Sequence, residues 1–244
     1  MKILKYKIFI NFFFIKCYAL RAMRYARKYL IFFGPPASGK GTQADKLGEK
    51  LNLPVISPGE LLRHERDRGT EIGKQAGPIL NRGGLASGEI IEKIINKRLA
   101  KKDAKHGFLL DGYPRAISQL KFLNNRFKKI ASDNDIILAV YIHVSAKEVK
   151  RRIAGRRVCD CGASYHAIYN PPKKQGICDL CGAKLYKRKD DSAEIIKIRI
   201  NRFNKSIKPI LKHYKKNNIL ININGEQSIG EVEKDIFNKL KDKV

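Results

Sequence analysis

The sequence lacks a long apolar segment, an internal repeat and a concentrated block of basic residues. Its N-terminal apolar run, Ile8–Ile15, spans only eight residues and is interrupted by Asn11. A membrane-crossing helix needs about 20 predominantly apolar residues. We therefore expect no membrane partner.

Acidic residues are also scarce. The chain has 23 Asp and Glu against 51 Lys and Arg, a formal net charge of +28. A basic surface of this size attracts polyanions, nucleic acids included, without sequence preference. The lysines are spread along the whole chain, however, which indicates a general compositional bias. We expect no nucleic acid as the main partner, and a smaller polyanion bound in a cleft would use only a few of these charges.

What is present is the composition of a globular protein. Hydrophobic residues make up 43% of the 244-residue chain and charged residues 30%, unlike a disordered sequence. This length is enough for one α/β core with one or two small insertions.

Residues 1–28 precede the first expected strand. A secretory signal would place small residues after the apolar run, whereas Lys16 and a basic stretch at 21–28 follow it. An Arg-rich transit peptide is a second possibility. The third, which we favour, is a true start at Met23, six residues before that strand. The extension is thus expected to be disordered, a leader or the product of a mis-assigned start, and none of these changes the fold.

The segment Gly34–Thr42, GPPASGKGT, has the spacing G-x-x-x-x-G-K of a phosphate-binding loop. It stands between an apolar run at 29–33 and a helix-like stretch at 40–51. Glycines allow a tight ring of inward-pointing backbone N–H groups, and the helix dipole and Lys40 add positive charge. Gly41 occupies the position where a magnesium-binding hydroxyl normally lies, and that hydroxyl comes one residue later.

Apolar runs and helix-start signals alternate along the rest of the chain. We predict further strands at 54–56, 108–110, 136–144 and 219–223, helices at about 59–68, 72–82, 88–103 and 116–130, and helix starts at Ser57, Ser145, Asp191 and Ser228. This alternation predicts an α/β fold with a doubly wound parallel sheet of five strands. Ligands of such sheets bind beyond the carboxyl ends of the strands, where Gly34 and Asp111 lie.

Asp111 directly follows the strand predicted at 108–110. A carboxylate there, opposite the phosphate loop, can hold Mg²⁺ directly or through water. The alternative is a turn-forming Asp before Gly112.

Six arginines stand near element ends or in a cysteine-bearing insertion, in a sequence that otherwise prefers lysine. Planar guanidinium groups suit bidentate phosphate recognition. As a set they indicate a clamp for a transferring phosphoryl group: Arg63, Arg115, Arg152, Arg156, Arg188 and Arg199.

Four cysteines lie in an irregular segment from 156 to 190, as Cys159-x-Cys161 and Cys178-x-x-Cys181, each pair followed by glycine. The pattern predicts a tetrahedral Cys₄ zinc site that would hold together a segment too small for its own core. The first pair is one residue short of the usual spacing, so its geometry must differ. Free thiols or a disulfide pair are the alternatives. Substitute ligands could come from Asp160 and His166.

Several motifs occur in order along the chain: GPPASGKGTQA from Gly34, ISPGELLR from Ile56, GFLLDGYPR from Gly107, RRIAGRRVC from Arg151, YNPPK from Tyr169, and RKDD from Arg188 with Ile198-Arg199 after it. From about Tyr29 to its C-terminus, the chain therefore resembles the bacterial adenylate kinases of the long-lid, zinc-bearing type, within the nucleoside monophosphate kinase family.

The resemblance implies a core of residues 29–56, 87–154 and 192–244, a helical insert at 57–86 that binds the nucleoside monophosphate, and a cysteine-containing lid at 155–191. The implied reaction is MgATP + AMP ⇌ 2 ADP by direct in-line transfer. The implied enzyme is a cytoplasmic monomer whose partners are ATP, AMP and ADP. Its implied cofactors are Mg²⁺ bound with ATP and a structural Zn²⁺ held by the four lid cysteines.

The resemblance also implies the site residues, in three overlapping groups. The ATP group is Gly34, Pro35, Ala37, Ser38, Gly39, Lys40, Gly41, Thr42, Arg152, Arg156 and Gln227. The AMP group is Pro58, Arg63, Ala86, Gly112, Arg115, Gln119, Arg188 and Arg199. The catalytic group is Lys40, Asp111, Arg115, Arg156, Arg188 and Arg199.

Within these groups the implied roles differ. Lys40 would hold phosphates, Arg63 and Arg115 would grip the AMP phosphate, and Arg152 would cover the ATP adenine. The transferring group would be neutralised by Arg156, Arg188 and Arg199. Asp111 would order the magnesium waters, and the hinge acids Asp190 and Asp191 could pair with lid arginines on closure.

The residues expected to contact the nucleotide base are compatible with two kinds of enzyme. Gln119 matches the amide that reads the adenine edge, but Pro58 stands where the family usually has threonine. The alternative is a nucleoside monophosphate kinase with relaxed or CMP/UMP preference, although such enzymes typically lack the cysteine lid. A nucleic-acid-binding zinc protein is the remote alternative, and it would leave Asp111 and the arginines without a role.

Overall fold

The structure of the chain, a computed structural model, describes residues 26–188 and 190–241. The expectations about a leader and the start at Met23 concern residues outside this range.

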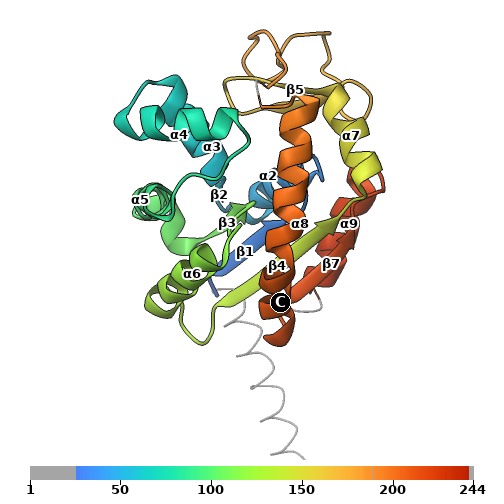
Figure 1. The fold of residues 1–244 in the computed structure, drawn as a ribbon. Coiled ribbons are helices and arrows are strands. Elements are labelled where there is room, and N and C mark those ends of the chain that lie inside the picture. Colours follow the sequence, from blue (N-terminus) through green and yellow to red (C-terminus); the bar gives the residue numbers. More distant parts are fainter. Residues whose placement is uncertain (1–25, 189, 242–244) are drawn as a thin grey trace, which may run out of the picture.

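A parallel sheet of five strands forms the centre of the molecule (Figure 1). Its strands lie in the order β2 (Val55–Ile56), β3 (Gly107–Asp111), β1 (Lys28–Phe33), β4 (Ile136–His143) and β7 (Leu220–Asn224). Every pair is parallel, and the register places Phe32 of β1 opposite Asp111 of β3. The predicted α/β fold with five parallel strands is confirmed.

Helices lie on both sides of this sheet (Figure 1). They are α2 (Lys40–Leu51), α3 (Pro58–Asp67), α4 (Glu71–Asn81), α5 (Gly88–Leu99), α6 (Ile117–Ile130), α7 (Ala146–Gly155), α8 (Ala193–Lys216) and α9 (Ile229–Lys241). The two cores they form explain why β1 is apolar or aromatic at every position from Tyr29 to Phe33. Tyr29, Ile31 and Phe33 pack with α3 to α6, whereas Leu30 and Phe32 pack with α2, α7 and α9.

The predicted helix start at Ser57 is confirmed: Ser57 is the N-cap of α3 and Pro58 its first residue, although the Ser57 side chain makes no cap hydrogen bond. Two other local predictions were wrong, because of a different local turn or a partner distant in sequence. The helix expected to 103 ends at Leu99 and is followed by a short 3₁₀ helix, Lys102–His106. The cap of α8 is Ser192, whose Oγ accepts the N–H of Ile195, whereas Asp191 is held by Arg156. Ser228 and Glu231 do form the expected reciprocal cap of α9.

The segment between α7 and α8 has little apolar packing of its own. It contains a two-stranded antiparallel sheet, β5 (Arg156–Val158) and β6 (Ser164–His166). Its buried cluster consists of Cys159, Tyr165 and Cys178. Over the described part of the chain, no helix combines the length and the apolar character needed to cross a membrane.

Candidate active site

The phosphate loop runs from the end of β1 to the start of α2. A Cβ on Gly34 would lie 2.7 Å from the carbonyl oxygen of Ile142 on β4, so only glycine lets the loop turn so close to the sheet. Gly39 has a left-handed φ of 87° and caps α2. Lys40, the first residue of α2, folds back over the loop and its Nζ donates to the Pro35 carbonyl, 3.1 Å away.

Gly41 faces Asp111 directly. A Cβ on Gly41 would lie 3.4 Å from Oδ2 of Asp111, so the glycine lets the first turn of α2 come close to the end of β3. Oδ1 of Asp111 is buried and has no hydrogen-bond partner within the described residues. A buried, unpartnered carboxylate oxygen beside a phosphate loop fits a role toward Mg²⁺ or its water ligands, because the ion prefers oxygen ligands and retains several waters.

Gly112 brings Arg115 and Lys40 together. Its φ is 65°, and a Cβ there would lie 2.8 Å from a terminal nitrogen of Arg115 and 3.2 Å from Cε of Lys40. Arg115 donates through Nε to the Gly112 carbonyl at 2.5 Å, and its backbone N–H donates to Oε1 of Gln119 at 2.7 Å. Oε1 of Gln119 is therefore already bonded to the backbone, and this leaves the amide NH₂ group for the cleft.

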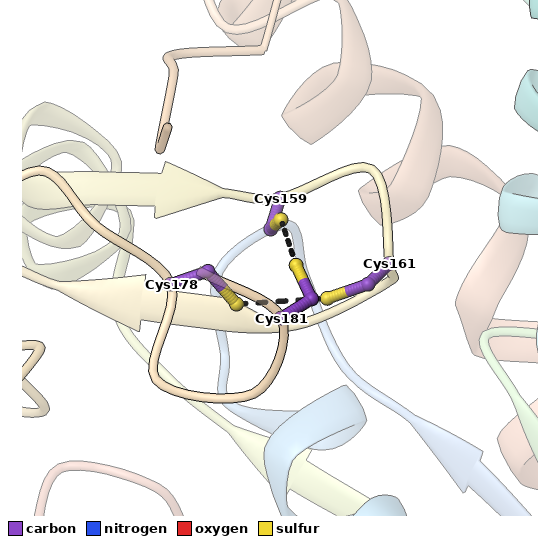
Figure 2. Close-up of side chains that lie close together, drawn as sticks. All are labelled: Cys159, Cys161, Cys178 and Cys181. Carbon is purple, nitrogen blue, oxygen red and sulfur yellow. Dashed lines mark hydrogen bonds between the residues drawn. The ribbon is translucent and has the colours of Figure 1, made fainter. Parts of the chain in front are cut away.

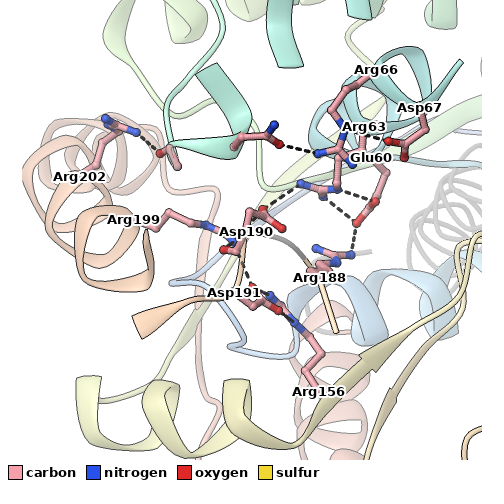
Figure 3. Close-up of polar contacts among 12 residues, drawn as sticks. Glu60, Arg63, Arg66, Asp67, Arg156, Arg188, Asp190, Asp191, Arg199 and Arg202 are labelled. Atoms are coloured by element: carbon pink, nitrogen blue, oxygen red, sulfur yellow. Dashed lines mark hydrogen bonds and ion pairs between the residues drawn. The ribbon is translucent and has the colours of Figure 1, made fainter. Parts of the chain in front are cut away.

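Four arginines and three carboxylates gather above the strand ends (Figure 3). They come from α3, from the segment between α7 and α8, and from α8 itself. We call this set the arginine cage: Arg63, Arg156, Arg188, Arg199, Glu60, Asp190 and Asp191.

Within the arginine cage, Asp190 and Asp191 hold two of the arginines. Arg156 forms a two-pronged pair with Asp191, with Nε 2.8 Å from Oδ2. Arg199 lies 3.1 Å from Oδ2 of Asp190 and 3.5 Å from Oδ1 of Asp191. The side chains of the two aspartates are only 8% and 7% exposed. They are fixed in the interior by their neighbours.

Burial of so many cations changes their pKa values. Burial lowers the pKa of Lys40 to about 7, helped by the charges of neighbouring arginines and opposed by Asp111. Burial likewise lowers the pKa of Arg199 to about 10. Both shifts show chiefly that these cations are kept from water, a cost that a bound anion would offset. Such a site favours the binding of a polyanion.

One open cleft of about 890 Å³ joins the phosphate loop, at Gly34 and Lys40, to Arg63, Asp190 and Arg199 of the arginine cage. The predicted site residues that line it are Gly34, Lys40, Pro58, Arg63, Ala86, Gly112, Arg115, Gln119 and Arg199. Sequence reasoning missed other lining residues, among them Arg202 and Phe203. The only available signal was their spacing of three and four positions from Arg199, which places them on the same side of α8.

Two of the predicted ATP residues, Arg152 and Gln227, are not among the residues that line the cleft. Arg152 of α7 donates to the Ser38 carbonyl at 3.3 Å and to the Gly225 carbonyl at 2.7 Å, so it joins the phosphate loop to the end of β7. Gln227, two residues after Gly225, donates to the Asn224 carbonyl and to Asp235. These contacts hold Gln227 between the end of β7 and α9.

The four cysteines between α7 and α8 point toward one another (Figure 2). Their sulfur atoms all lie within 4.8 Å of one another, with Sγ atoms 3.4 Å apart for Cys159 and Cys181 and 3.6 Å apart for Cys161 and Cys178. Sulfurs around a tetrahedral zinc, each about 2.3 Å from the ion, are about 3.8 Å apart. The donor set therefore fits zinc, and the cysteines are not joined by disulfides.

The two cysteine pairs reach this arrangement with loops of different length. Gly162 N–H donates to the Cys159 carbonyl across three residues, whereas Gly182 N–H donates to the Cys178 carbonyl across four. The short first pair thus closes as a tighter turn. Neither suggested substitute ligand belongs to the cluster: Asp160 accepts from Tyr186, and Nδ1 of His166 accepts two backbone N–H groups.

The chain is similar to known proteins of one family. A family model described as "Adenylate kinase" matches residues 32–219. Curated proteins named "Adenylate kinase" from Petrotoga mobilis and Methanocella arvoryzae are each 43% identical to the chain, over 87% and 84% of it and 97% and 95% of their own lengths. One from Staphylococcus aureus is 42% identical over 86% of this chain and 98% of its own.

Proposed function

The chain belongs to the adenylate kinase family and is an ATP:AMP phosphotransferase; from this premise we propose how its residues carry out MgATP + AMP ⇌ 2 ADP. The observation that carries the proposal is the cleft that joins the phosphate loop to the arginine cage. Transfer is direct and in-line, between two nucleotides that meet end to end.

On the ATP side, the loop from Gly34 to Thr42 surrounds the phosphates with backbone N–H groups, and Lys40 adds its charge. When phosphates arrive, the Lys40 ammonium exchanges its bond to the Pro35 carbonyl for a charge-assisted bond to them. Arg152 lies over the loop and covers the adenine, with Gln227 beside it. Mg²⁺ bound with ATP would neutralise the β- and γ-phosphates, and Asp111 would hold its water ligands.

On the AMP side, Arg63 and Arg115 grip the monophosphate. A Cβ on Gly59 would lie 3.3 Å from one terminal nitrogen of Arg63 and 3.8 Å from one of Arg115, so both guanidinium groups point to the same place. Pro58, Ala86, Gly112 and Gln119 surround the base and ribose. Arg156, Arg188 and Arg199 stabilise the charge that develops on the transferring group, which fixed cations do best when water is excluded.

We propose that the chain is divided into three structural units. They are a core at 29–56, 87–154 and 192–244, a monophosphate-binding insert at 57–86 and a lid at 155–191. Closure of the two smaller units over both nucleotides excludes water, which would otherwise accept the phosphoryl group. A zinc ion at the four cysteines would keep the lid rigid as it moves. A monomer located in the cytoplasm is the state proposed for this enzyme, in keeping with the reduced thiols of the lid.

We expect nucleotide binding to take up a proton above neutral pH. Burial lowers the pKa of Lys40 to about 7 in the free protein, and bound polyphosphate raises it again because an opposite charge favours the ammonium. At about pH 8.5 the phosphates of ATP are already ionised, so ATP binding takes up about one proton per site. Calorimetry in two buffers of different ionisation enthalpy measures this uptake.

The matched control for the proton uptake is Lys40→Met, in which the uptake disappears. Identical binding heats in both buffers for the unmodified chain would show that Lys40 is already charged in the free protein.

A panel of monophosphates tests the selectivity of the enzyme. With MgATP as donor, we expect AMP to give a kcat/KM at least about tenfold above CMP, UMP and GMP, because the Gln119 amide faces the cleft. Coupled detection of ADP release measures each rate. CMP or UMP ranking above AMP would replace adenylate kinase by the pyrimidine-preferring alternative that Pro58 leaves open.

A further inference from the structure

Glu60 occupies an unexpected position in the arginine cage. As the third residue of α3 it stands where a capping acid is expected, but its carboxylate turns toward Arg63 and Arg188 (Figure 3). Oε2 accepts Nε of Arg63 at 2.9 Å, and Oε1 lies 2.8 Å from a terminal nitrogen of the same arginine. Arg188, from the proposed lid, donates to the same Oε1. One carboxylate thus bridges two arginines from different parts of the chain.

The guanidinium edge that Glu60 occupies is one of two that Arg63 can offer to an anion. Arg63 has one fork formed by Nε and a terminal nitrogen and another formed by the two terminal nitrogens. Glu60 fills the first fork, and on the second NH1 lies 3.6 Å from Oδ2 of Asp190. A phosphate that binds the first fork in the bidentate way therefore has to replace Glu60.

Exposure indicates which carboxylate leaves. The side chains of Asp190 and Asp191 are 8% and 7% exposed, whereas that of Glu60 is 45% exposed. The arginines that Glu60 bridges are themselves only 16% and 15% exposed. Glu60 can rotate into solvent and remain hydrated, whereas the arginines and the aspartates would stay in place.

Charge favours the exchange. The pKa of Glu60 is held at about 2, since Arg63 and Arg188 outweigh the opposing effect of burial, so the group is an anion at any working pH. It carries one negative charge, whereas a nucleoside monophosphate carries close to two at neutral pH and presents three oxygens. An exposed carboxylate on a flexible stem is a weak competitor for such a ligand.

We propose that Glu60 is an internal stand-in for substrate phosphate: it neutralises Arg63 and Arg188 while no monophosphate is bound, and the incoming phosphate displaces it. This inference rests on the proposed role of Arg63 and Arg188 at the monophosphate. Glu60 then lowers the affinity for AMP by competition within the molecule, so that the second ADP, formed from AMP, leaves readily.

The test is the affinity of Glu60→Gln for AMP, measured by calorimetry without ATP. If Glu60 covers the arginines about 90% of the time, the variant binds AMP about tenfold more tightly, because apparent affinity scales with the fraction of open sites. KM for AMP falls in parallel, whereas KM for ATP is unchanged. Inorganic phosphate becomes a stronger competitor of AMP to the same degree. Adenosine, which has no phosphate, binds as it does to the unmodified chain.

Glu71→Gln is the matched control. Glu71 lies on α4 in the same insert, is 82% exposed and pairs only with the exposed Lys74 among the described residues. The substitution changes the net charge equally, so it isolates the local effect from the general field of a basic protein. Glu60→Ala, which removes the carboxylate and the hydrogen-bonding head together, should tighten AMP binding at least as much as Glu60→Gln.

Unchanged or weaker AMP binding by both folded Glu60 variants would overturn the inference, because it would mean that the carboxylate stays in place or supports the ligand. Failure of the proposed function has a different signature, namely no ADP formed by the unmodified chain from ATP and AMP. The inorganic phosphate arm reports on displacement of Glu60 in either case.

Discussion

Replacing Lys40 with methionine lowers kcat by about a thousandfold and leaves the protein folded. The ammonium of Lys40 is the one full charge that the phosphate loop itself provides, and it lies in a buried cluster where a fixed charge acts strongly on the transferring group. Methionine resembles lysine in length and apolar stem, but it has no charge with which to stabilise the negative charge that develops on the transferring phosphoryl group. Steady-state turnover with saturating MgATP and AMP measures the loss.

Stability should change in the opposite direction. The unfolded chain keeps the proton of Lys40 to about pH 10.4, whereas burial lowers the pKa in the folded protein to about 7. The folded state therefore bears the full cost of this charge below pH 7, and that cost falls as the pH rises through the window between the two values. At neutral pH, Lys40→Met should melt at the same temperature as the unmodified protein or slightly higher.

Lys46→Met is the matched control for this experiment. Lys46 lies two turns along the same helix, is 44% exposed and pairs with Glu233 of α9, away from the cleft. Its replacement should alter turnover less than twofold, since a single exposed ion pair contributes only about 0–1 kcal/mol. Turnover of Lys40→Met within tenfold of the unmodified enzyme would contradict the role assigned to Lys40.

We expect Cys178→Ser to abolish the proposed zinc binding and to unfold the segment from 155 to 191. Cys178 is 2% exposed and belongs to a buried cluster of only three residues, so the segment from 155 to 191 has little apolar packing to replace the metal. In such small sites the free energy of metal binding, about 10–16 kcal/mol in zinc-finger peptides, serves as folding free energy. Native mass spectrometry should show one zinc per unmodified chain and none in the variant.

Limited proteolysis locates the effect of Cys178→Ser. Cleavage should fall between 155 and 191 in the variant, and in the unmodified protein after treatment with a strong chelator, while the five-stranded core resists. Asp160→Asn serves as control, because Asp160 contacts Tyr186 and lies outside the sulfur cluster; it should retain its zinc. Metal-free protein after purification with reduced thiols would refute the zinc proposal.

Local patterns were sufficient for much of the fold. The phosphate loop, the strand before it and the helix after it were predicted within one residue of the observed β1 and α2, because glycine spacing and apolar runs act over a few neighbouring residues. The cap of α9 by Ser228 and Glu231 was equally local. The helix start at Ser57 was also predicted, but the local pattern did not reveal that Glu60 pairs with Arg63 and Arg188.

By itself, therefore, the sequence determined the parallel sheet, the phosphate loop, the set of arginines and the four cysteines, since these depend on residue type and short spacing. Tertiary structure alone decided which charges meet. In the sequence, Gly41 was only a position that lacks the usual magnesium-binding hydroxyl. In the fold, the absence of a side chain at Gly41 allows Asp111 to come close to α2. Likewise, only the fold places Glu60 on an arginine 128 residues away. Electrostatic pairing depends on distance in space, which the order of residues along a chain does not specify.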